Sequence, residues 1–222
     1  METLETLDTA QRVEVDARKI HTDAPAGNAA VAEYLKLYNA YWGGYDGARE
    51  LLDMMKTHGF FIAPASAKYH GARPGGLVAH TNAVVRNVMA LASGNFPQFA
   101  DGRMDVVDAV RAALIHDICK LDLYQPGTKN VKDPNTGKWE SVPCYLHNDG
   151  RLMGHGEESV ILAMKYIPNM PPRVMLAVRW HMGAYKDPDK ISQMTKDFDR
   201  CPEALAVHLA DMMAAHDTEA DT

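Results

Sequence analysis

The sequence predicts an all-α protein, a helical bundle with a long loop or a small hairpin inserted into it. Apolar residues recur at spacings of three and four through most of the chain, which is the pattern of amphipathic helices. Strand signals are almost absent from the first half of the chain, and glycine or proline stands where most of the helical patterns stop. A chain of 222 residues that is 46% hydrophobic suits one compact globular unit.

The N-terminal part of the chain predicts an extension followed by the main domain. Residues 1–28 are polar and indicate a weak helix plus a linker, and residues 29–41 have a helical pattern that stops at Gly43-Gly44. Asp46 is a candidate cap for the next helix, which we expect to run to His58 before Gly59. We therefore divide the chain into an extension at 1–45, the main domain at 46–216 and a tail at 217–222.

The main domain continues with a glycine-rich loop at 68–76 and a helix from about Leu77. The central helix is expected at about Met104 to Leu121. A long polar segment, 125–151, has closely spaced turn signals and predicts a loop or small hairpin, and loops of this length are usually functional. Further helices are expected from about residue 157, from 172 to 183, and from 204 to 215.

Composition excludes several classes of protein. The 23 basic and 29 acidic side chains give a net charge of −6, which argues against an extended nucleic-acid surface but leaves room for a local basic pocket. The three cysteines form no C-x-x-C pair, so neither a disulfide framework nor a zinc ribbon is indicated. With an acidic N-terminus and no run of 18 apolar residues, we expect no membrane partner and a cytoplasmic location.

Asp117 is the most informative residue of the predicted core. In a continuous helix it shares the apolar stripe of Val106, Val110 and Ala113, and no basic residue shares that face. Burying an ionised carboxylate costs several kcal/mol, in order of magnitude, so a metal ion is the expected partner. The alternative is that His116 and Asp117 form a hydrogen-bonded pair inside the core. Asp211 raises the same question, because only it and His208 interrupt the apolar run at 204–215.

Histidines on separate predicted helices complete a set of candidate metal ligands. For each of them the alternative is an ordinary core histidine that a hydrogen bond satisfies. Imidazole and carboxylate ligands suit zinc, iron, manganese, cobalt or nickel, and magnesium is also possible. Because tens of residues separate the members, the site would be built inside the bundle. The ordered series is His80, His116, Asp117, His155, His181 and Asp211.

This series resembles that of the HD-domain superfamily of metal-dependent phosphohydrolases. Several segments are also similar to the HD domain of YhaM-type 3′-5′ exoribonucleases, and the resemblance covers about residues 60–216. The family usually has glycine at the position of Cys119. This difference leaves open whether the pocket beside Lys120 has the usual shape of the family. The similar segments are Gly75-Gly76-Leu77-Val78-Ala79-His80, Leu114-Ile115-His116-Asp117-Ile118-Cys119-Lys120, Leu152-Met153-Gly154-His155 and Trp180-His181-Met182-Gly183.

The resemblance implies an HD-type helical bundle that holds two divalent metal ions. His80, His116 and Asp211 would hold one ion, His155 and His181 the other, and Asp117 would bridge them. A metal-bridging hydroxide would cleave a phosphate ester of a nucleotide or of a short or cyclic oligonucleotide. Lys120 would pair with a phosphate oxygen, although it can also be a solvated helix end.

Other candidate contacts with a small phosphorylated substrate are basic and aromatic side chains. The alternative for each charge is an ordinary solvated side chain, and for each aromatic ring a place in the core. Tyr124 and Trp139 are further candidates to stack a base, and His70 and His208 to support a metal ligand. The candidates for substrate binding are Arg73, Lys129, Lys132, Tyr145 and Arg151.

Two other functions remain open. The same six-ligand series resembles that of diiron oxygenases on the HD fold, such as myo-inositol oxygenase, in which the metals activate dioxygen for reaction with a small polar substrate. A non-catalytic nucleotide-binding module is the second alternative. Hydrolysis is expected because it is the commoner chemistry on this scaffold.

Overall fold

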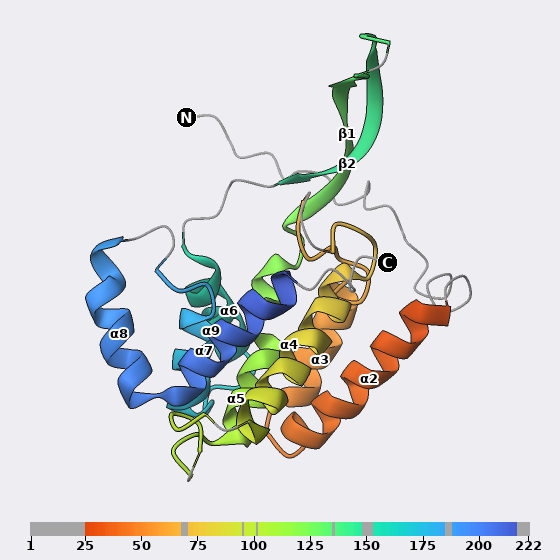
Figure 1. Ribbon diagram of the computed structural model, residues 1–222. Helices are drawn as coiled ribbons and strands as arrows, with labels where there is room; N and C mark the ends of the chain where they lie inside the picture. The colour runs from red at the N-terminus through yellow and green to blue at the C-terminus, as the bar shows by residue number, and fades with distance from the viewer. Residues whose placement is uncertain are drawn as a thin grey trace, which may run out of the picture.

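The computed structural model describes residues 25–67, 71–94, 96–100, 102–134, 136–147, 153–184 and 188–216. It is mostly helical, as the sequence predicts, with one two-stranded antiparallel sheet among the described residues (Figure 1). The longer helices are α2 (Pro25–Trp42), α3 (Ala48–Thr57), α4 (Gly76–Ser93), α5 (Val106–Ile115), α6 (His155–Met164), α7 (Pro172–Trp180), α8 (Ile191–Arg200) and α9 (Pro202–Ala215). The short 3-10 helices are η2 (Ile118–Lys120) and η3 (Pro188–Lys190). None of the helices in these ranges combines the length and apolar character needed to cross a bilayer.

Helix α5 lies at the centre of the bundle and packs against α2, α4, α7 and α9. Its sequence explains both its start and its position. Asp105 caps its N-terminus, where the carboxylate accepts the backbone N–H groups of Val107 at 2.9 Å and Asp108 at 3.1 Å. The residues from Ala112 to Ile115 are fully buried, so the helix ends inside the core, where its last residues lead into the predicted metal site.

Helix α2 packs into the same core as the later helices. The Tyr34 hydroxyl donates to the Leu114 carbonyl at 2.9 Å, and the Trp42 indole N–H donates to the Arg111 carbonyl at 3.2 Å. Both aromatic side chains are buried, and both acceptors belong to α5. The division of the chain at residue 45 stays a prediction about domain organisation.

The polar segment that follows Leu123 forms the predicted hairpin. Strand β1 (Tyr124–Lys132) pairs antiparallel with β2 (Trp139–His147), with Tyr124 opposite His147 and Lys132 opposite Trp139. Figure 1 shows this ribbon projecting away from the helices. Trp139, at its far end, is 69% exposed. The ribbon is therefore an insertion outside the core.

Three local predictions need correction. The central helix ends at Ile115, not near Leu121, because the His116 ring bonds the Ala113 carbonyl, an oxygen that a continuing α-helix would offer to the Asp117 N–H. Gly47, with a φ of 80°, precedes α3 as its N-cap, in place of Asp46. Helix α8 was not predicted, because most of its side chains are exposed and it presents little apolar surface to the core.

Candidate metal centre

The six predicted ligands come from five parts of the fold. Helix α4 carries His80, the turn between α5 and η2 carries His116 and Asp117, and α9 carries Asp211. His155 is the first residue of α6, and His181 follows the last residue of α7. All six are buried except His155, which is partly buried. Residues up to 131 positions apart in the chain thus meet in one cluster.

The first half of the cluster consists of His80, His116 and Asp211. One potential ligand atom from each residue lies within 4.8 Å of the others. His80 Nε2 lies 2.9 Å from Asp211 Oδ1, and His116 Nε2 lies 3.8 Å from the same oxygen. The Asn87 side chain donates to the Ala210 carbonyl at 3.1 Å and so joins α4 to α9 beside these ligands. This group has the donor set and the burial expected of a metal site.

Asp117 lies between this group and the histidine of α7. Its Oδ2 is 3.3 Å from His116 Nε2 and 3.8 Å from His80 Nε2. Its Oδ1 is 3.4 Å from His181 Nε2. The two carboxylate oxygens therefore face different histidines.

Backbone carbonyl groups orient two of the histidines. His116 Nδ1 lies 2.7 Å from the Ala113 carbonyl oxygen, and His181 Nδ1 lies 2.7 Å from the Val178 carbonyl oxygen. Because a carbonyl oxygen only accepts, Nδ1 carries the proton in both rings. Nε2 of each ring then faces the cluster with a free lone pair, the arrangement found in metal-binding histidines.

Among the described residues, no hydrogen-bond partner is found for the buried atoms His116 Nε2, His181 Nε2 and Asp117 Oδ1. Leaving a buried acceptor unsatisfied costs about 1–3 kcal/mol. Burial alone would lower the pKa of His116, but Asp117 and Asp211 raise it above the ordinary value, so a proton and a metal ion compete for Nε2 of this ring. With both rings neutral, all three atoms are acceptors that a metal cation can satisfy, and the residues present therefore fit one or more bound metal ions.

The expectation that no basic residue faces Asp117 was wrong. Lys120 Nζ lies 2.7 Å from Asp117 Oδ2, and both side chains are buried. The two residues are three positions apart, a spacing that brings side chains together on an α-helix as well as in the 3-10 helix η2, so a helical projection was compatible with this pair. The ammonium group of Lys120 satisfies Asp117 Oδ2, whereas no described residue donates a hydrogen bond to Asp117 Oδ1.

The charges of the cluster keep its acidic and basic groups ionised. Burial alone would raise the pKa of Asp117, but Lys120 and His116 outweigh it and hold this pKa well below the ordinary value. Burial alone would lower the pKa of Lys120, but Asp117 and Asp211 raise it above the ordinary value. Burial lowers the pKa of His80 despite its hydrogen bond to Asp211, so His80 favours the neutral form that binds metal.

A second group of potential ligands consists of Asp117, Cys119 and His155. One atom from each lies within 4.8 Å of the others. Helix α6 approaches α7 closely at Gly156, where a β-carbon would lie 2.1 Å from the Arg179 carbonyl oxygen. Glycine next to His155 therefore lets this histidine reach the cluster. The sequence predicted His155 here but gave Cys119 no role as a ligand.

The predicted substrate-binding residues lie at varied distances from the cluster. Lys129 and Lys132 are exposed on β1, five and eight residues beyond Tyr124, which corresponds to about 17 Å and about 26 Å along a strand. One small phosphate at the cluster cannot reach both, so they would contact only a substrate that extends along the ribbon. Tyr145 is partly buried on β2, where burial raises its pKa, and Arg73 is exposed ahead of α4. His70 and Arg151 lie outside the described residues.

The remaining candidates have identifiable surroundings. The Tyr124 ring lies at the base of the ribbon, 5.6 Å from the His147 ring, and Trp139 lies at its exposed end. His208 Nδ1 is 2.7 Å from the His181 carbonyl oxygen. His208 therefore supports the backbone of a predicted ligand and does not bond its ring.

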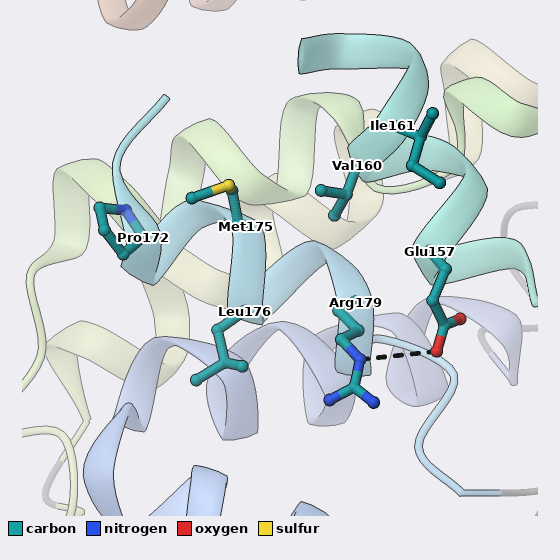
Figure 2. A pocket seen from close by; sticks show the side chains of 7 residues that line it. All are labelled: Glu157, Val160, Ile161, Pro172, Met175, Leu176 and Arg179. Atoms are coloured by element: carbon teal, nitrogen blue, oxygen red, sulfur yellow. Dashed lines mark ion pairs between the residues drawn. The ribbon is translucent and has the colours of Figure 1, made fainter. Parts of the chain in front are cut away.

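An apolar hollow of about 380 Å³ lies apart from the cluster, between α6 and α7. Figure 2 shows Val160 and Ile161 of α6 and Met175 and Leu176 of α7 at this hollow, with Glu157 and Arg179 paired at one end. The two charged groups are 3.5 Å apart. None of the predicted metal ligands lines it, so we do not assign it to the metal centre.

Comparisons with models of protein families, with curated proteins and with solved structures find no match to this chain. The resemblance to the HD-domain superfamily therefore rests on the residues and motifs described above. The fold and site define the protein as a mostly helical chain with a buried histidine and aspartate cluster that can hold metal.

Proposed function

We propose that this protein is a metal-dependent phosphohydrolase with an HD-type bundle, acting on a phosphate ester of a nucleotide or of a short or cyclic oligonucleotide. One observation carries the proposal. Three buried atoms, on His116, Asp117 and His181, converge without hydrogen bonds to the described residues, in a cluster of six histidine and aspartate residues. The buried lysine beside them suits an anionic substrate.

The residues divide between two metal positions. His80, His116 and Asp211 would hold one ion, and His155 and His181 the other. Asp117 would serve both, since its two oxygens face different histidines. When bound, such a pair of ions supplies Lewis acidity, lowers the pKa of bound water and stabilises charge on the attacking and leaving oxygens.

Lys120 has a separate role in this proposal. It is the counter-ion of Asp117, at 2.7 Å. With metal bound at Asp117, the ammonium group would be available to bind a phosphate oxygen. Asp117 and Asp211 outweigh burial and raise the pKa of Lys120, which keeps the ammonium group charged while it faces these carboxylates.

An anaerobic assay tests the proposed reaction. A hydrolase needs no change of metal valence, so zinc, magnesium or manganese without oxygen should support cleavage of a nucleoside phosphate, cyclic nucleotide or short oligonucleotide. Activity that appears only with iron and dioxygen, and consumes the gas, would assign the protein to the oxygenase class. Nucleotide binding without turnover under any of these conditions would indicate a non-catalytic module.

Metal content tests the site independently of activity. Wild-type protein saturated with manganese or zinc and then freed of excess metal should retain more ion than Asp117→Ala, measured by elemental analysis. Equal content in the two proteins, or none in the wild type, would contradict the assignment of the cluster as a metal centre.

A further inference from the structure

The cluster contains one residue type that the proposed ligand set does not use. Cys119 is 2% exposed and is the middle residue of η2, two positions after Asp117. One atom of Cys119, one of Asp117 and one of His155 all lie within 4.8 Å of one another. Thiolate, imidazole and carboxylate groups are the three common protein ligands of zinc and related metals. The other two cysteines, Cys144 and Cys201, belong to neither group of potential ligands found among the described residues.

We propose that Cys119 binds metal as a thiolate together with Asp117 and His155, at the second position of the cluster. This inference rests on the metal-binding part of the proposed function and adds a sulfur ligand to it. Binding would release the thiol proton to solvent, as for other cysteine ligands. The two metal positions would then differ chemically, because His80, His116 and Asp211 offer only nitrogen and oxygen.

The backbone fixes Cys119 relative to the helix that carries His155. The Cys119 N–H donates to the Ser159 hydroxyl at 3.2 Å, and Ser159 is fully buried in α6. Helix α6 begins at His155, one turn before Ser159. The positive end of α6 also faces this region and favours a negatively charged thiolate. Two of the three ligands are therefore held by one hydrogen-bonded contact between η2 and α6.

Asp117 provides an independent indication of a cation here. Lys120 Nζ lies 2.7 Å from its Oδ2, whereas Oδ1 is buried and makes no hydrogen bond. His181 Nε2, 3.4 Å from Oδ1, is also buried without a hydrogen bond. The unsatisfied side of the carboxylate therefore faces away from Lys120 and toward the histidine proposed for the second metal. A cation bound by Asp117, Cys119 and His155 would also lie beside His181.

A sulfur ligand changes which metals the second position prefers. Thiolate with imidazole favours zinc, iron or cobalt, whereas magnesium and manganese prefer sites made of oxygen. We expect the second position to retain zinc or cobalt in competition with excess magnesium. The position formed by His80, His116 and Asp211 should discriminate less strongly between zinc or cobalt and magnesium.

Cobalt(II) reports the sulfur ligand directly, because a cobalt–thiolate bond gives an intense charge-transfer band in the near ultraviolet. We expect this band in the cobalt-loaded wild type and in Cys144→Ala, the control at a partly buried cysteine of the ribbon. The band should be lost in Cys119→Ala and Cys119→Ser, while the weaker visible bands of cobalt bound to nitrogen and oxygen remain. A band that persists in both Cys119 variants would overturn the inference.

X-ray absorption of the zinc-loaded wild type gives a second readout that does not depend on the folding of a variant. A sulfur neighbour should appear at about 2.3 Å, beyond the nitrogen and oxygen neighbours at about 2.0–2.1 Å. Bound zinc with only nitrogen and oxygen neighbours would refute the role of Cys119 alone. Wild type that binds neither cobalt nor zinc would refute the metal centre, and the proposed function with it.

Discussion

Replacing Lys120 by methionine tests whether metal and lysine compete for Asp117. The substitution keeps much of the side-chain volume but removes the ammonium group that lies 2.7 Å from Asp117 Oδ2. Both partners are buried, and removing one partner of a buried pair costs about 3–5 kcal/mol, since it leaves an uncompensated charge. For a domain of this size, about 2–4 °C per kcal/mol gives a fall in melting temperature of about 6–20 °C.

The loss should be large only without metal. In the metal-saturated protein, ions on Asp117 replace the positive charge of Lys120, so the difference between Lys120→Met and wild type should shrink markedly. The measurement is urea unfolding of both proteins, first with a chelator and then with saturating zinc. Each comparison is made within one condition, because bound metal stabilises both proteins by mass action.

Lys56→Met is the matched control for this experiment. Lys56 makes the same kind of pair with Asp53, three residues earlier at 3.3 Å, but both side chains are about half exposed, at 46% and 59%. Such surface pairs contribute about 0–1 kcal/mol, with or without metal. If Lys120→Met lost the same free energy of unfolding with the chelator and with zinc, competition between Lys120 and metal for Asp117 would be refuted. A loss no larger than that of Lys56→Met in the chelator would refute the buried pair itself.

Three further predictions follow from contacts of the core and the cluster. Phosphate-ester hydrolysis should fall further in Asp117→Ala than in His155→Ala, because Asp117 lies beside His80, His116 and His181 and is also grouped with His155. Equal rates in a steady-state assay would contradict this. Tyr34→Phe should lower the free energy of unfolding, measured by urea denaturation, by about 1–2 kcal/mol, because it removes the hydroxyl that donates to the buried Leu114 carbonyl at 2.9 Å. An unchanged midpoint and slope of the urea transition would disprove the role of this bond. Gly156→Ala should lower the free energy of unfolding by about 1–3 kcal/mol in the same measurement, because its β-carbon would lie 2.1 Å from the Arg179 carbonyl oxygen. The control Gly44→Ala, with no atom within 4 Å of its added carbon, should be close to neutral. Similar losses for the two variants would argue against the close approach of α6 and α7.

The ligand residues could be predicted because their chemistry conflicts with their sequence surroundings. Asp117 and Asp211 stand in apolar runs, and burying their carboxylates requires a partner whatever the details of packing. His155 stands between two glycines, where packing requires no imidazole ring. Such conflicts are local, so they can be recognised without knowing how the helices are arranged.

The features that were missed depend on contacts between distant segments or on the exact end of a helix. The Lys120 pair is an exception, because its spacing of three residues is local and helical periodicity places both side chains on neighbouring positions. Helix α8 has only a short apolar stripe, through Met194 and Phe198, and is also held through Asp197, which accepts the Trp180 indole N–H at 2.9 Å. The placement of Cys119 beside His155 depends on the packing of η2 against α6, which residue spacing does not reveal.

The ends of three helices give the metal centre an electrostatic bias that does not depend on its carboxylates. Helices α5 and α7 each end at a histidine of the cluster, so the partial negative charge of two helix C-termini lies there. Helix α6 directs its positive end to the same region. Together with Asp117 and Asp211, this arrangement repels an anionic substrate from the metal-free protein. Binding should therefore be ordered, with metal ions entering first and reversing the local potential before a phosphate can follow.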